Sequence, residues 1–136
     1  MQSFRALGCC ILLLTPCVVG VGVSAKVATA ASPAARRGEA TTLNNMGLAY
    51  FRQKRYQEAL RSFQQTLTIK REVKNRRSEA RVLNNIGETY SKTGRFQEVL
   101  RSYQQALTIE RAIKDRKGEV TTLNNIARLH HQGHTN

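Results

Sequence analysis

A single motif recurs along this chain at a constant interval. The triplet Leu-Asn-Asn stands at positions 43–45, 83–85 and 123–125, and residues 38–77 match residues 78–117 at 21 of 40 positions. Self-similarity at a fixed period of this size is typical of repeat architectures, in which each unit packs on its neighbours. The sequence therefore predicts two complete copies, 38–77 and 78–117, and an incomplete third copy at 118–136.

Each complete copy contains two stretches with the apolar spacing of an amphipathic helix. In the first copy one stripe of apolar residues spans 40–50, and a second stripe spans 56–73. Residues 53–55 are expected to turn the chain between the two helices. Neither helix can bury its stripe alone, so the pairs must stack on one another. We therefore predict an all-α solenoid of antiparallel helix pairs with about five helices.

Glycines occupy two kinds of position in this pattern. Gly94 lies in the turn of the second copy, where a residue with positive φ ends a helix cleanly. Lys54 holds the same place in the first copy, so that turn is expected to be strained. Gly47 and Gly87 lie inside helices, where glycine costs about 1 kcal/mol relative to alanine. Their recurrence predicts a packing role, in which the missing side chain lets the partner helix approach closely.

The order of Leu43, Gly47, Tyr50, Ala59 and Phe63 resembles the tetratricopeptide repeat pattern, with leucine where that family often has tryptophan. The second copy follows the same pattern. Its period of 40 residues, against the usual length of about 34, resembles the long-helix subclass of kinesin light chains and of bacterial and cyanobacterial arrays. The resemblance implies a protein-protein interaction module rather than an enzyme.

Two departures from the family pattern concern the end of each copy. Arg71 and Arg111 stand where the family has its closing proline. The additional residues of each copy are expected as added helix and as a longer link, at 72–77 and 112–117.

The resemblance also implies where a partner binds. In similar arrays the first helix of each pair lines an inner, concave groove, and ladders of asparagine there hold extended peptides. A carboxamide donates and accepts hydrogen bonds, so it can bind a peptide backbone, although asparagine is unfavourable inside a helix. We predict that the peptide-binding residues are the tandem asparagines and the basic residues beside them: Asn44, Asn45, Arg52, Arg81, Asn84, Asn85, Lys92, Asn124, Asn125 and Arg128. The alternative for the asparagines is structural, with one member of each pair bonded to a neighbouring helix.

The charge of the chain indicates the kind of partner. Lysine and arginine number 22 against 9 acidic residues, which gives a formal net charge of +13, and the expected groove has Glu88 as its one acid. This balance favours an acidic peptide or protein partner. A solvated cationic surface that keeps the array soluble is the alternative. Nucleic acid is not expected, because no nucleic-acid-binding module is present.

The third copy stops after its first helix, with Ala127 in place of the recurring glycine. Two interpretations remain. Residues 118–131 form a cap on the helix at 96–113, or the chain is a truncated N-terminal fragment of a larger array without independent function. An array linked to a caspase-like protease domain, as in some bacterial relatives, is one example. Truncation would leave apolar surface on the last helix, so it predicts self-association.

The first 37 residues differ in composition from the copies. A basic start, an uncharged apolar stretch over 6–23 and the small residues Ser24 and Ala25 predict a secretory signal peptide at 1–25. The mature chain would then be secreted or periplasmic, with cleavage after Ala30 as the second choice. The alternative is an uncleaved membrane anchor at 6–23. Residues 26–37 lack apolar periodicity and are expected to form a flexible linker.

Residue types that carry catalysis or bind metal are sparse. The three cysteines, at 9, 10 and 17, lie within the predicted signal peptide, so no disulfide or thiolate metal site is expected in the mature chain. His130, His131 and His134 stand close together near the end, but no carboxylate or cysteine accompanies them, so a polar tail is expected there. We therefore predict no metal, no cofactor and no catalytic residue.

Overall fold

The computed structural model describes residues 31–133, and five α-helices account for most of them. In chain order the helices are α3 (Pro33–Arg52), α4 (Tyr56–Glu72), α5 (Arg76–Lys92), α6 (Phe96–Ala112) and α7 (Arg116–Gly133). No strand occurs between residues 31 and 133, which confirms the all-α prediction. None of these helices is both long and apolar enough to cross a membrane. The predicted signal peptide, its membrane-anchor alternative and His134 lie outside the described residues.

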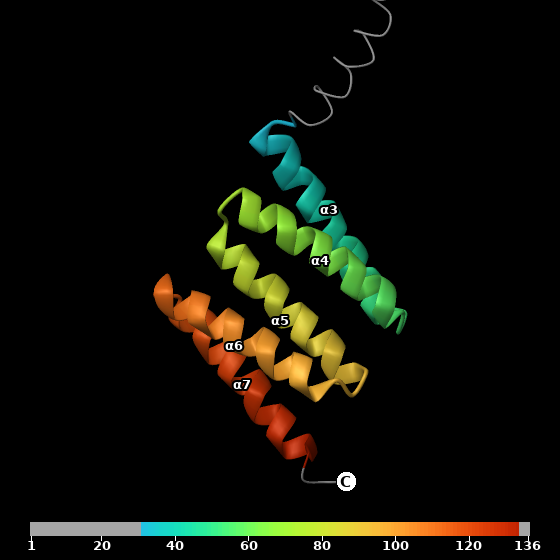
Figure 1. Cartoon of the computed structure of the whole chain (residues 1–136), viewed down its shortest axis with the longest axis vertical. Helices are drawn as coiled ribbons and strands as arrows, with labels where there is room; N and C mark the ends of the chain where they lie inside the picture. The colour runs from blue at the N-terminus through green and yellow to red at the C-terminus, as the bar shows by residue number, and fades with distance from the viewer. Residues whose placement is uncertain (1–30, 134–136) are drawn as a thin grey trace, which may run out of the picture. The chain divides into compact units, whose positions relative to one another are not determined.

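Each helix packs on the helix that follows it in the chain (Figure 1). The pairs α3–α4 and α5–α6 are the two complete copies, and contacts of α4 with α5 and of α6 with α7 join successive copies. Helix α5 also contacts α7, so the first helices of the second and third copies lie on one side of the array. This nearest-neighbour packing confirms the predicted solenoid.

All four turns between these helices are three residues long, and each contains a residue in the left-handed region. Gly94 has a φ of +72°, as expected, and Lys54 adopts the same conformation at +60°. Two further lysines, Lys74 at +53° and Lys114 at +57°, do so at the turns between copies, where no glycine indicates a positive φ. The longer links expected at 72–77 and 112–117 are wrong, because only residues 73–75 and 113–115 lie between helices. The added helix expected there is confirmed, since α4 and α6 continue to Glu72 and Ala112.

Helix α3 begins earlier than the repeat pattern indicates. It starts at Pro33, so the second half of the segment 26–37 that was expected to be a flexible linker is helical. Proline suits the first position of a helix, because its fixed φ is helical and its missing N–H would have no partner there. The guanidinium of Arg36 then bonds Glu39 at 3.1 Å and reaches Glu72 of α4 at 3.3 Å. These contacts attach the added turns to the array.

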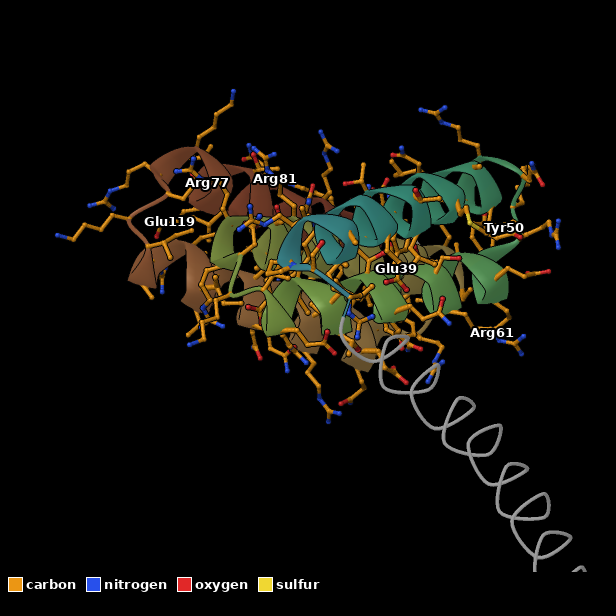
Figure 2. The ribbon with its side chains drawn as sticks, turned by 90° about the horizontal axis from the view of Figure 1, so that it is seen from above. Glu39, Tyr50, Arg61, Arg77, Arg81 and Glu119 are labelled. Carbon is orange, nitrogen blue, oxygen red and sulfur yellow. The ribbon has the colours of Figure 1, made fainter. Side chains whose placement is uncertain are left out.

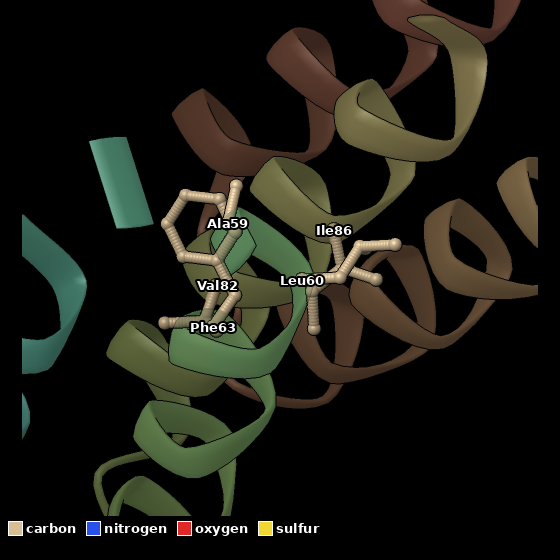
Figure 3. Packing of buried hydrophobic residues seen from close by; sticks show 5 residues of the cluster. All are labelled: Ala59, Leu60, Phe63, Val82 and Ile86. Carbon is tan, nitrogen blue, oxygen red and sulfur yellow. The ribbon is translucent and has the colours of Figure 1, made fainter. Parts of the chain in front are cut away.

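The apolar interior is divided among three clusters rather than gathered in one core. The first cluster joins α4 and α5 through Ala59, Leu60, Phe63, Val82 and Ile86 (Figure 3). The others join α5 to α6 and α6 to α7; their members are Ala80, Leu83, Ala106 and Ile109, and Val99, Tyr103 and Leu129. Burial at each contact between helices therefore stabilises the array locally.

The two recurring helix glycines have the packing role predicted for them. A Cβ atom on Gly47 would lie 2.6 Å from Cε1 of Phe63, and one on Gly87 would lie 2.5 Å from Cε1 of Tyr103. In both copies an aromatic ring of the second helix thus lies against the bare backbone of the first helix. The two helices of each copy therefore lie closer together than a residue with a Cβ atom at the glycine position would allow.

An arginine-glutamate cluster stands where the family has its closing proline. Glu79 is buried, and its carboxylate accepts hydrogen bonds from Arg71 at 2.9 Å and from Arg76 at 2.7 Å. Glu119 repeats the arrangement with Arg111 and Arg116. Arg71 and Arg111 belong to the second helix of one copy and the glutamate to the first helix of the next. Each cluster therefore bridges two copies, a role that was not predicted for these residues.

Candidate peptide-binding face

The first helices of the copies, α3, α5 and α7, form the surface that we call the first-helix face. Figure 2 shows Arg81 of α5 on the side of α3, whereas Arg61 of α4 points from the opposite side. Two clefts open between neighbouring first helices. They contain five of the ten predicted binding residues: Asn44, Arg81, Lys92, Asn125 and Arg128.

The first cleft lies at the junction of the first and second copies and has a volume of about 160 Å³. Its predicted members are Asn44 of α3 and Arg81 of α5, and Lys70 of α4 joins them. The remaining lining is Ala40, Thr41, Ser78 and Val82. None of the described residues that line this cleft is acidic, so its potential is positive. Lys70 was not predicted, because the predicted binding residues all lie on the first helices of the copies.

The second cleft lies between α5 and α7 and has a volume of about 90 Å³. Three predicted residues line it, namely Lys92, Asn125 and Arg128, together with Glu88, Ser91, Tyr103, Leu129 and Gln132. Burial of Tyr103, assisted by the nearby charge of Glu88, raises the pKa of its phenol to about 12, although Arg128 opposes the shift. The phenol is therefore neutral at physiological pH.

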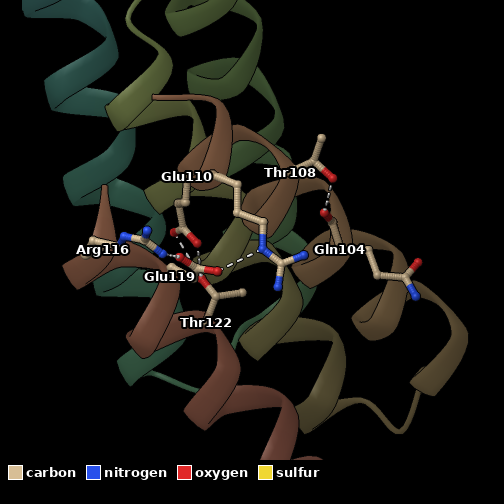
Figure 4. A network of polar contacts seen from close by, with 7 residues as sticks. Gln104, Thr108, Glu110, Arg116, Glu119 and Thr122 are labelled. Atoms are coloured by element: carbon tan, nitrogen blue, oxygen red, sulfur yellow. Dashed lines mark hydrogen bonds and ion pairs between the residues drawn. The ribbon is translucent and has the colours of Figure 1, made fainter. Parts of the chain in front are cut away.

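Asn84 occupies an internal position between copies. Its Nδ2 donates to Oγ1 of Thr122 at 2.8 Å and to Oε1 of Glu110 at 3.2 Å. The hydroxyl of Thr122 lies 2.7 and 3.0 Å from the two oxygens of Glu110 (Figure 4). These three side chains come from α5, α6 and α7, and we call them the junction triad. The structural alternative therefore describes Asn84 better than a role in peptide binding.

Glu110 is the least expected member of the junction triad, because the residue is 2% exposed and no cation among residues 31–133 bonds its carboxylate. Burial raises the pKa of its carboxyl, while the hydrogen bonds from Thr122 and Asn84 oppose the rise. The negative charges of Asp115 and Glu119 raise the pKa further. A carboxyl whose pKa in the folded protein lies above its pKa in the unfolded chain is favoured by the fold in its neutral form. The stabilising contribution is present below the unfolded pKa and is lost as the pH rises through the folded pKa.

The remaining predicted residues line neither cleft. Asn45, Arg52 and Asn124 are exposed, and Asn85 is half-buried on α5. Their role in binding stays a prediction. The arginines at the turns, by contrast, form ion pairs within the array. Arg55 and Arg95 bond Glu58 and Glu98, and these hydrogen bonds lower the pKa of both carboxyls.

Metal coordination has no support in residues 31–133. No group of three or more histidine, cysteine, aspartate or glutamate residues in this range is placed to hold a metal ion. His130 and His131 are exposed near the end of α7.

Stacked helical hairpins with a cleft at each junction define an α-solenoid repeat protein. The family model for the tetratricopeptide repeat matches residues 38–112, more than half of the chain, and the chain belongs to that family. A comparison with curated proteins found no match. Tetratricopeptide repeats are non-catalytic scaffolds that generally mediate protein-protein interaction.

Proposed function

We propose that this protein binds an extended, acidic segment of a protein partner along the first-helix face. The observation that carries the proposal is the charge of the two clefts. Arg81 and Lys70 line the first cleft, Lys92 and Arg128 line the second, and Glu88 is the one acidic side chain among the lining residues. Cationic clefts of this kind attract carboxylates and steer their approach.

The asparagines supply the second part of the recognition. Asn44 and Asn125 line the clefts, and Asn45, which follows Asn44 in the chain, is exposed. A carboxamide can pair with both the N–H and the C=O of an extended backbone, which satisfies a peptide irrespective of its sequence. The affinity would then come from hydrogen bonds to the partner's backbone, and the preference for acidic side chains would come from the basic residues of the clefts.

Selection from a random peptide library displayed against the full-length chain tests the proposal. We expect acidic segments to be enriched. The double substitution Arg81→Gln/Arg128→Gln should weaken the selected peptides by about tenfold, since each cleft loses a cation. The matched control is Arg61→Gln/Arg101→Gln, which removes the same charge from exposed positions of α4 and α6. Equal weakening by both pairs would mean that net charge alone attracts the peptides, and would refute binding at the first-helix face.

We further propose that the mature protein acts outside the cytoplasm, secreted or periplasmic. The support is the basic, apolar and small-residue order of residues 1–25. N-terminal sequencing of the protein recovered from an exporting bacterial host tests this, and the expected first residue is Lys26. An intact Met1 in the membrane fraction would instead support an anchor at 6–23.

A second candidate function concerns the outer side of α7. This surface would pack against a further repeat if the chain is part of a longer array, or against a second copy of the chain if the protein associates with itself. Val120 and Leu123 are 57% and 42% exposed, whereas their counterparts in the second copy, Ala80 and Leu83, are 1% and 2% exposed beneath α6. Sedimentation of the full-length chain at increasing concentration tests self-association. Dimers that disappear in the Val120→Ser/Leu123→Ser variant would support it, and a concentration-independent monomer would contradict it.

A further inference from the structure

The two junctions between copies place different residues at equivalent positions. In the second junction Asn84 bonds Glu110, and Thr122 completes the junction triad. Forty residues earlier the same three positions are Asn44, Lys70 and Val82, and all three line the first cleft. The carboxylate that fills the second junction is thus replaced in the first by a lysine beside an open cleft of about 160 Å³.

We propose that the first cleft is a carboxylate-binding site, in which Asn44, Lys70 and Arg81 receive an acidic side chain of the bound partner. This inference rests on the function proposed above and names the contact that gives its preference for acidic segments. The partner's carboxylate would take the place beside Asn44 that the carboxylate of Glu110 takes beside Asn84.

The second junction supplies the template for this contact. There the Nδ2 atom of the asparagine lies 3.2 Å from a carboxylate oxygen, so the backbone geometry of a junction brings these two groups within hydrogen-bonding distance. In the first junction the side chains of Asn44 and Lys70 make no hydrogen bond or ion pair with any residue among 31–133. Their donors are therefore available to a ligand.

The electrostatic surroundings of the two junctions are opposite. The carboxyl of Glu110 lies near Asp115 and Glu119 and has no cationic partner within the part of the chain that the structure describes. In the first junction Asn75 stands at the position equivalent to Asp115. Glu79, the counterpart of Glu119, is neutralised by Arg71 and Arg76. With Lys70 and Arg81 at the cleft, an ionised carboxylate gains charge-assisted hydrogen bonds there.

A titration followed by NMR tests the site in the full-length chain. The probe is tetraglutamate with blocked ends, so that its side chains are its only carboxylates, and blocked tetraglutamine is the uncharged control. We expect the side-chain amide signal of Asn44 to shift to saturation with tetraglutamate and not with tetraglutamine. The signal of Asn84 should stay in place, because its amide is already used in the junction triad.

The double substitution Lys70→Glu/Val82→Thr gives the first junction the same three residue types as the junction triad. It should weaken tetraglutamate binding by about tenfold or more, since the internal carboxylate then occupies Asn44. Arg101→Glu is the matched control, with the same change of charge at an exposed position of α6, and should weaken binding by less than about threefold. Circular dichroism verifies that each variant keeps its helices. An unmoved Asn44 signal, or equal weakening by the two variants, would overturn the site.

The library-selected peptides separate this inference from the wider proposal. If they bind the Lys70→Glu/Val82→Thr variant as tightly as the unchanged protein but lose affinity to Arg81→Gln/Arg128→Gln, the carboxylate site is wrong and the first-helix face still binds. If tetraglutamate shifts Asn44 while no peptide responds to Arg81→Gln/Arg128→Gln, the carboxylate site stands without the proposed peptide groove.

Discussion

Replacement of Gly87 by alanine sets two effects of opposite sign against each other. Alanine favours a helix interior by about 1 kcal/mol relative to glycine, so the local effect is stabilising. The added Cβ, however, would lie 2.5 Å from Cε1 and 2.8 Å from Cδ1 of Tyr103. Carbon atoms pack at about 3.5–4.0 Å, so the ring must shift by about 1 Å. Overpacking of this kind costs about 1–3 kcal/mol.

The surroundings of Tyr103 decide which effect wins. Tyr103 is 4% exposed and packs against Val99 and Leu129, so a shift of its ring, even toward the second cleft that it lines, would disturb these contacts. We therefore place the overpacking cost near the upper end of its range, at about 2–3 kcal/mol. The Gly87→Ala variant should be less stable than the unchanged protein by about 1–2 kcal/mol, measured by urea unfolding of the full-length chain followed by circular dichroism.

Gly38 provides the matched control, because it lies inside α3 and an added Cβ there would meet nothing within 4 Å. Gly38→Ala should stabilise the protein by up to about 1 kcal/mol through helix propensity alone. In the Gly87→Ala background, Tyr103→Leu should recover about 1–2 kcal/mol as coupling between the two sites. Equal effects of the two glycine substitutions, or additive effects at positions 87 and 103, would refute close helix contact as the reason for the recurring glycine.

Three further predictions concern charges and turns. Glu110→Gln should stabilise the protein at pH 8 and change little at pH 4, because only the ionised carboxyl is penalised by burial; urea midpoints of both proteins at the two pH values check this. Lys114→Gly should raise stability by about 0.5–1 kcal/mol, measured as the thermal midpoint, since its φ of +57° is costly for any residue with a Cβ. Glu79→Ala should cost about 1–2 kcal/mol in urea unfolding because it leaves two arginines unpaired, whereas loss of the exposed Glu39 should cost less than about 0.5 kcal/mol.

The helices and their pairing were predictable because their signals are local and repeated. Apolar spacing places α3 to α6, and the recurrence of Gly47 and Gly87 at one register predicts the close approach of the partner helix, where the structure places an aromatic ring. The start of α3 at Pro33 was missed because residues 33–37 carry no apolar stripe, and their helix is supported by Arg36 reaching Glu72 on another helix. A contact between residues so far apart in the sequence cannot be predicted from the pattern of neighbouring residues.

The turns between copies show a different reason for error. Gly94 signals a positive φ by its chemistry, whereas Lys74 and Lys114 adopt the same conformation without any such signal. The geometry of two packed helices joined by three residues imposes it. Tertiary packing therefore overrides local preference here, at a cost that a glycine would remove.

The candidate site was predictable only as far as the repeat is uniform. Asn44 and Asn84 occupy the same place in the same triplet, yet one lines an open cleft and the other is bonded within the junction triad. The difference comes from residues 26 and 38 positions further along the chain, where Glu110 and Thr122 replace a lysine and a valine. Recurrence of an asparagine therefore establishes where its side chain lies but leaves its partner open, and the identity of that partner separates a structural residue from a binding residue. A comparison of the copies at positions 70 and 110, rather than at the triplets themselves, is the sequence signal that would have separated them.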